Sequence, residues 1–70
     1  MIQQLTTSEI EVLQHAANGL GLKGTARAAG IPMHSVKDRR ESARHKLGAA
    51  NVTQSVARAV SLGYIAGGQA

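Results

Sequence analysis

Residues 22–47 read LKGTARAAGIPMHSVKDRRESARHKL, and the fold of the chain is decided in this stretch. The alanine-rich part, residues 22–29, predicts a short helix that Gly30 closes. Pro32 suits the opening of a following helix, where a missing N–H group is harmless. That helix is expected over residues 33–47, because its inner positions recur at i, i+4, i+7 and i+11: Val36, Arg40, Ala43 and Leu47.

The connection between these two predicted helices is tight, and the second helix is the longer and more basic one. Two helices joined by Gly30-Ile31-Pro32 are typical of the helix-turn-helix arrangement, whose second helix enters the DNA major groove. Such a helix presents its N-terminal half to base edges. The outward positions of residues 33–47 carry donors, acceptors and charges of both signs: His34, Ser35, Lys37, Asp38, Glu41, Ser42 and His45.

Two further helices are predicted on either side of this pair. Thr6 and Glu9 form a capping-box pattern that starts a helix over residues 7–18, with Leu5 and Ile10 spaced as a hydrophobic staple. Thr53 is expected to cap a helix over residues 53–62, with Val56, Val60 and Leu62 as its apolar side. We therefore expect an all-α, four-helix domain over residues 1–66, followed by a frayed tail at 67–70.

Composition favours a small binding module over an enzyme. The chain has 70 residues and one aromatic residue, which fits a single small domain. It has no cysteine, so disulfides and thiolate metal sites are excluded. Its longest uninterrupted apolar run is three residues, and no export signal is visible, so we expect a cytoplasmic protein without membrane contact. No cofactor is expected.

Charge is unevenly distributed along the chain and indicates a polyanion as the partner. The net charge is +4, and the sequence pI is near 10.4. Residues 1–20 hold Glu9 and Glu11 and no lysine or arginine, whereas all eight cations lie in residues 21–70. A dense basic stretch of this kind is either a surface that binds nucleic acid or a solvated helix face.

Three patterns that suggest other chemistry lack the context they need. Gly19–Gly24 matches G-x-G-x-x-G, but the dinucleotide motif follows a strand, and here a helix precedes it. No two of His15, His34 and His45 share an i, i+4 spacing, so a metal site is not expected. The serines have no general base with a supporting acid, so catalysis is not expected either.

The chain also resembles the LuxR/GerE-type DNA-binding domain over about residues 4–65, without gaps. The matching residues are Leu5-Thr6, Glu9, Glu11-Val12-Leu13, Gly19-Leu20, Lys23, Ala26, Gly30-Ile31, Ser35-Val36-Lys37, Lys46-Leu47-Gly48 and Ala59 followed by Gly63-Tyr64-Ile65. The resemblance implies a four-helix helix-turn-helix domain that binds DNA as a homodimer through its last helix and regulates transcription. It implies base and phosphate contacts at Ser35, Lys37, Asp38, Arg39 and Glu41.

The sequence departs from the family pattern at five positions. Pro32 lacks the usual capping oxygen, so that cap is lost or is supplied by Ser35. Arg39 stands where the family often has histidine, and it keeps a phosphate donor. Arg40 stands where the family usually has a branched apolar residue, so its aliphatic part must pack in the protein while its guanidinium reaches solvent. Gly24 and Thr25 replace an acid and an isoleucine, which predicts a weaker second helix and a thinner core.

The candidate DNA contacts are Lys23, His34, Ser35, Lys37, Asp38, Arg39, Glu41 and Arg44. For several basic or acidic residues the sequence leaves two roles open. Lys23 and Arg27 either contact phosphate or only make their helix soluble, and Lys37 and Glu41 either bind DNA or pair with each other. Arg44 and Lys46 contact DNA or neutralise the C-terminal end of the helix dipole. The candidate dimer residues are Val52, Val56, Val60 and Leu62, which form either the core or the dimer seam. A dimer is expected to bind half-sites roughly 10 base pairs apart.

The function expected from these observations is a free-standing, homodimeric transcriptional regulator of bacterial or phage type, controlled by its own concentration. The alternative is a protein-interaction adaptor of the same fold that binds RNA polymerase or another regulator. A third hypothesis, a promoter-recognition module like the last region of a sigma factor, normally requires a longer chain.

Overall fold

The computed structural model describes residues 4–66 and contains four helices, as the sequence predicts. They are α1 (Thr7–Ala17), α2 (Leu22–Ala29), α3 (Met33–Leu47) and α4 (Val52–Ser61). No strand occurs within residues 4–66, so the all-α prediction is confirmed. The predicted tail at 67–70 lies outside the described residues.

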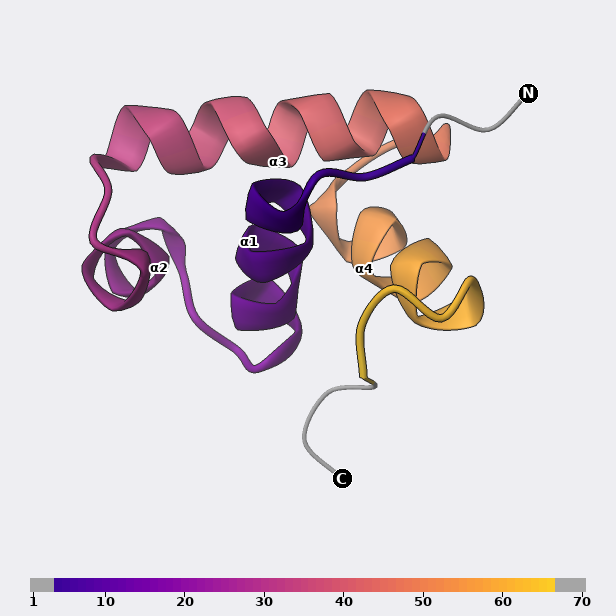
Figure 1. Ribbon diagram of the computed structural model, residues 1–70, viewed down its shortest axis with the longest axis horizontal. Helices are drawn as coiled ribbons and strands as arrows, with labels where there is room; N and C mark the ends of the chain where they lie inside the picture. Colours follow the sequence, from indigo (N-terminus) through magenta and orange to yellow (C-terminus); the bar gives the residue numbers. More distant parts are fainter. Residues whose placement is uncertain (1–3, 67–70) are drawn as a thin grey trace.

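Helix α3 is the central element of the fold. It lies across α2, α1 and α4, which follow one another beneath it from left to right in Figure 1. α1 packs against both α2 and α4, and these two do not contact each other. Because α3 contacts all three other helices, one long side of it is covered and the opposite side is left exposed.

The core is built mainly from small and branched aliphatic side chains. Val36, Ala43 and Leu47 are buried on the inner side of α3, as their spacing predicts. Leu13 of α1, Ala59 of α4 and Ile65 beyond α4 join Ala43 and Leu47 in one cluster. Ile65 lies in the segment after α4, where the amide of Ala66 donates to the Gln14 side chain at 3.0 Å and ties this segment to α1.

The start of α1 follows the predicted capping box. The Glu9 amide donates to Thr6 Oγ1 at 3.1 Å, and the Thr6 amide donates to Glu9 Oε1 at 2.9 Å. α1 ends one residue earlier than predicted, because Asn18 is its C-cap and Gly19 has a φ of 90°, a left-handed conformation that suits glycine. No side chain caps α2 or α3, so Ser35 does not replace the oxygen that Pro32 lacks.

The prediction for the start of α4 was wrong. Asn51, not Thr53, is the N-cap: its side chain accepts from the Gln54 amide at 2.8 Å, and the Gln54 side chain accepts from the Ala50 amide at 2.6 Å. α4 therefore covers Val52–Ser61 instead of 53–62. Asn51 and Thr53 are both residues that can cap a helix. Asn51 is the cap in the structure, and Gln54, at position N3, bonds back to the chain before the helix.

The inner side of α4 differs in part from the prediction. Its fully buried residues are Ser55 and Ala59, which are small and allow a close approach to the other helices. Val56 and Val60 are half-buried and pack at the margin of the core, whereas Leu62 is 51% exposed. Ser55 is satisfied in this apolar setting, because its hydroxyl donates to the Asn51 carbonyl at 2.8 Å.

None of the helices within residues 4–66 has the length and apolar character that crossing a membrane requires.

Candidate nucleic-acid interface

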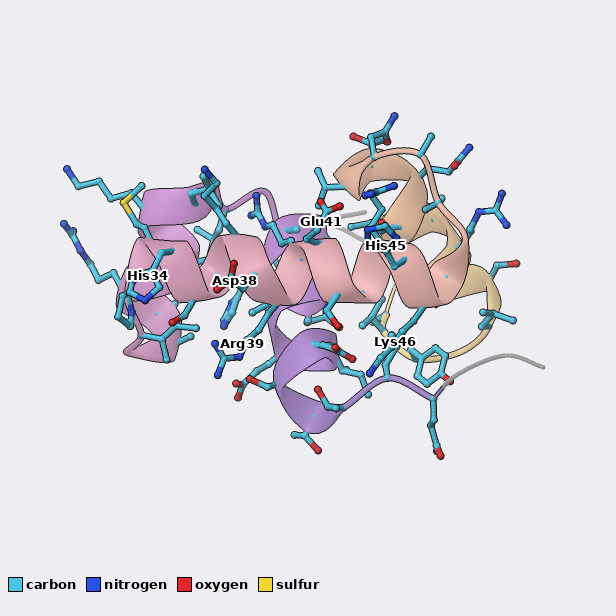
Figure 2. The ribbon with its side chains drawn as sticks, turned by 90° about the horizontal axis from the view of Figure 1, so that it is seen from above. His34, Asp38, Arg39, Glu41, His45 and Lys46 are labelled. Carbon is cyan, nitrogen blue, oxygen red and sulfur yellow. The ribbon has the colours of Figure 1, made fainter. Side chains whose placement is uncertain are left out.

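The exposed side of α3 carries a line of four titratable side chains. His34, Asp38, Glu41 and His45 are all exposed, and Figure 2 shows them along the side of α3 that faces away from the other helices. Their spacing of i, i+4, i+7 and i+11 places them opposite the buried inner residues. We name these four residues the outer ridge. It combines two carboxylates with two imidazoles and contains no lysine or arginine.

The basic residues of this region lie beside the outer ridge or on α2. Lys37 is exposed and forms no ion pair with any residue in the range 4–66. The Lys37–Glu41 pair, which the sequence left open as the alternative to DNA contact, is not formed, because the Glu41 carboxylate turns toward the C-terminal end of α3. Lys23 and Arg27 are exposed on α2, so both of them are accessible to an approaching phosphate.

Arg39 lies on the side of α3 that faces α1 (Figure 2). Its Nε donates to Ser8 Oγ at the start of α1, and its Nη1 lies 3.4 Å from the Ser35 carbonyl oxygen. Arg39 and Ser35 are both half-buried. The guanidinium that was predicted to contact phosphate therefore also links α3 to α1.

A buried carboxylate forms the other link between these two helices. Glu9 is only 5% exposed and accepts from Ser42 Oγ at 2.6 Å and from Lys46 Nζ at 2.9 Å, besides the Thr6 amide. Burial alone would raise the pKa of Glu9, but the hydrogen bonds from Ser42, Thr6 and Lys46 together lower it. We name Thr6, Glu9, Ser42 and Lys46 the Glu9 cluster.

Sequence reasoning found only the local half of the Glu9 cluster. The capping box is visible over three residues, whereas Ser42 and Lys46 follow Glu9 by 33 and 37 positions. Lys46 lies in the last turn of α3, and its ammonium pairs with Glu9, a partner that neither alternative considered for Lys46 included. The spacing of Ser42 and Lys46 by four residues on a helix was the one available signal.

Arg44 is held at both ends of its guanidinium. Its Nη1 donates to the Ala49 carbonyl at 2.9 Å, while its Nε and Nη2 donate to Glu41 Oε2, the former at 3.2 Å. His45 Nε2 lies 3.0 Å from the same Glu41 oxygen. The Arg44 hydrogen bond lowers the pKa of Glu41, and the same bond raises the pKa of Arg44. Glu41 is therefore an ionised acceptor at neutral pH.

Arg40 and Thr25 show how two departures from the family pattern fit together. Thr25 is fully buried on α2, and Arg40 Nη2 lies 3.5 Å from its hydroxyl and 3.2 Å from the Leu20 carbonyl. The prediction that the Arg40 guanidinium reaches solvent is only partly right, because the group is partly buried and burial lowers its pKa. Its buried Nε has no hydrogen-bond partner among the described residues. A polar contact thus stands where the family has two apolar residues.

The predicted dimer residues lie on and beyond α4. Val52, Val56 and Val60 are half-buried and pack against the core of the same chain. Leu62 is exposed beside a hollow of about 330 Å³ that is also lined by Lys46, Leu47, Arg58 and Ser61. Part of the apolar surface of this helix is therefore left uncovered by its own chain.

An all-α unit whose long third helix is buried on one side and bare on the other, with cations beside the bare side, is a helix-turn-helix domain of the DNA-binding class. A family model described as bacterial regulatory proteins of the luxR family matches residues 3–59, and the chain belongs to this family. Membership confirms the resemblance, implies DNA-binding transcriptional regulation and identifies a non-enzymatic protein. No curated protein and no solved structure gives a match.

Proposed function

We propose that the chain regulates transcription as a homodimer, in which α3 of each copy enters the major groove of one DNA half-site. The observation that carries this proposal is the two-sidedness of α3: its inner side is buried under three helices, and its outer ridge stands clear of them. An α-helix with one fully exposed long side fits the major groove. We propose that residues 1–66 form one DNA-binding unit.

In this proposal, the outer ridge approaches base edges and the flanking groups contact phosphates. Lys37 is the leading phosphate or guanine contact, because it is exposed and has no acidic partner within residues 4–66. Asp38 and Glu41 are acceptors for base amino groups. The complete proposed set is Lys23, His34, Ser35, Lys37, Asp38, Arg39 and Glu41, and Arg44, also predicted from the sequence, acts through Glu41.

A matched pair of lysines on α3 tests this proposal. If about six phosphates are neutralised, the logarithm of DNA affinity falls against the logarithm of salt concentration with a slope near −5. Lys37→Ala is expected to reduce that slope by about 1 without changing stability. Lys46→Ala is the control: it disturbs the Glu9 cluster, so it lowers stability and leaves the slope unchanged.

Titration of a selected duplex by fluorescence anisotropy at several salt concentrations measures the slope for the wild type and for both variants. Equal slopes for wild type and Lys37→Ala would refute the assignment of Lys37.

We propose the uncovered part of α4 as the seam of the homodimer, formed by Val52, Val56, Val60 and Leu62. The exposed Leu62 supports this, because a leucine half in water gains about 1 kcal/mol or more when a partner covers it. Leu62→Glu is expected to shift the protein toward monomer in sedimentation equilibrium. Leu20 is an exposed leucine in the loop between α1 and α2, so Leu20→Glu is the control, and an unchanged dimer in both variants would exclude this seam.

The two carboxylates of the outer ridge favour a second candidate function, an adaptor that binds RNA polymerase or another regulator. Asp38 and Glu41 would then meet cationic groups of a protein instead of base amino groups. Titration with random and selected duplexes at physiological salt separates the two functions. An adaptor is expected to bind both duplexes equally and only at micromolar concentration, whereas a regulator prefers the selected duplex at least a thousandfold.

A further inference from the structure

The contacts of the Glu41 carboxylate are one-sided. Arg44 Nε, Arg44 Nη2 and His45 Nε2 all meet Oε2, whereas Oε1 accepts from no residue in the described range 4–66. The Glu41 side chain is 58% exposed on the outer ridge (Figure 2). The carboxylate is thus held by one oxygen and offers the other to the surroundings.

The residue that holds Glu41 is itself fixed. Arg44 is 27% exposed, and its Nη1 donates to the Ala49 carbonyl just beyond α3. A planar guanidinium that is bonded along both edges has little freedom left, so it restricts the rotation of the carboxylate it holds. Glu41 therefore meets a ligand already oriented, and less side-chain entropy is lost on binding.

We propose that Arg44 is a positioning residue that orients Glu41 so that its Oε1 accepts a hydrogen bond from the N4 amino group of a cytosine in the major groove. This inference rests on the proposed function, since it requires α3 to lie in that groove. It assigns to Arg44 a role in base preference in place of the phosphate contact expected from its charge.

The chemistry of base edges leads to cytosine. An ionised carboxylate only accepts hydrogen bonds, and guanine and thymine present only acceptors in the major groove. Adenine has an amino donor, but its neighbouring N7 is an acceptor that repels a carboxylate. Cytosine presents its N4 donor without an adjacent acceptor, so it is the base that Glu41 favours.

A phosphate contact by Arg44 would disrupt this arrangement. Three of its nitrogens are engaged, Nη1 with Ala49 and both Nε and Nη2 with Glu41. Turning the guanidinium toward a phosphate would release the Glu41 carboxylate next to the same phosphate, where it is repelled. The exposed Lys37 has no such commitment among the described residues and is better placed to bind phosphate.

The first experiment uses the unaltered protein. A preferred duplex is selected from random sequences, and the base pair at which Glu41→Gln changes the preference is identified. The cytosine there is then replaced by pyrimidin-2-one, which lacks the N4 amino group. The wild-type protein is expected to lose about tenfold in affinity, the usual scale for one hydrogen bond to a charged group. An unchanged affinity would overturn the assignment of cytosine.

The second experiment tests Arg44. Arg44→Gln and Arg44→Lys are expected to lose most of their discrimination between cytosine and pyrimidin-2-one, to about threefold or less, while other base preferences persist. Arg44→Lys keeps the charge but not the planar fork, so it separates orientation from net charge. A uniform loss on all duplexes with a salt slope smaller by about 1 would instead identify Arg44 as a phosphate contact. Far-UV circular dichroism verifies that both variants are folded.

The outcomes also separate this inference from the function on which it rests. If the wild-type protein prefers no duplex over another, sequence-specific regulation fails, and the role of Arg44 fails with it. If the wild-type protein is selective but the Arg44 variants discriminate against pyrimidin-2-one as strongly as it does, only the inference is overturned.

Discussion

The Ser42 hydroxyl of α3 donates to the buried carboxylate of Glu9 in α1 over 2.6 Å, and Lys46, one turn further along α3, pairs with the same carboxylate at 2.9 Å. Because Glu9 also accepts from the Thr6 amide, a single side chain caps α1 and fastens α3 across it. The Glu9 cluster therefore fixes how α3 lies on the domain.

Glu9→Gln is expected to destabilise the fold by about 1–3 kcal/mol, since an amide loses the charge opposite Lys46 and bonds its partners more weakly. Urea denaturation followed by far-UV circular dichroism measures the change. Glu11→Gln, an exposed position on the same helix, is the control and is expected to change stability by less than about 0.5 kcal/mol. Equal effects of the two substitutions would contradict the structural role of Glu9.

Stability is expected to fall on acidification. The folded pKa of Glu9 lies below its ordinary value of 4.5, so its contribution is complete above that pH and is lost as the pH drops through the lowered folded pKa. The exposed Glu41, whose pKa is also lowered, adds to this trend. Urea midpoints measured from pH 7 down to pH 3 are expected to fall less steeply in Glu9→Gln, and parallel profiles would rule out Glu9 as a source of the effect.

Gly24→Ala is expected to stabilise the protein by up to about 1 kcal/mol, because alanine is the better helix former. A Cβ at this position would lie 3.3 Å from Leu20 Cδ2, the end of a flexible side chain that is 37% exposed and free to shift slightly. Thermal unfolding is the measurement. Gly30→Ala provides the contrast: its φ of 70° is left-handed, so the substitution is expected to destabilise by about 1 kcal/mol.

The contact between Thr25 and Arg40 is expected to make their substitutions non-additive. Thr25→Val removes an acceptor from a partly buried guanidinium, and Arg40→Met removes the donor that faces a buried hydroxyl. The double variant restores an apolar pair, so it is expected to be more stable than the sum of the single effects by about 0.5 kcal/mol. A double-mutant cycle in urea measures this coupling, and strictly additive effects would mean that the two side chains do not interact.

The helices were predictable because their signals are local. The spacing of Val36, Ala43 and Leu47 identified the inner side of α3, and the Thr6–Glu9 pattern marked the start of α1. The helix α4 was predicted, but its N-cap was assigned to the wrong residue, because Asn51 and Thr53 are both good capping residues. The burial of Ser55, a polar residue, depends on how closely α4 approaches its neighbours and on a hydroxyl that bonds its own helix.

The exposed positions of α3 were also predictable, but their partners were not. Periodicity placed His34, Asp38 and Glu41 outward, and all three are exposed. Arg39 bonds Ser8, which lies 31 positions away, and such a contact depends on the packing of α3 across α1. For Glu41, the sequence analysis considered only Lys37 as an ion-pair partner, whereas the carboxylate pairs with Arg44, whose guanidinium also donates to the Ala49 carbonyl.

The fastening of α3 by Glu9, and by Arg39 through Ser8, has a thermodynamic consequence for DNA recognition. Since α3 is already folded and held on the domain by these contacts, the proposed binding of α3 to a duplex requires no disorder-to-order transition in residues 33–47. The heat-capacity change of complex formation should then reflect only the surface covered at the interface, without the additional contribution that accompanies coupled folding.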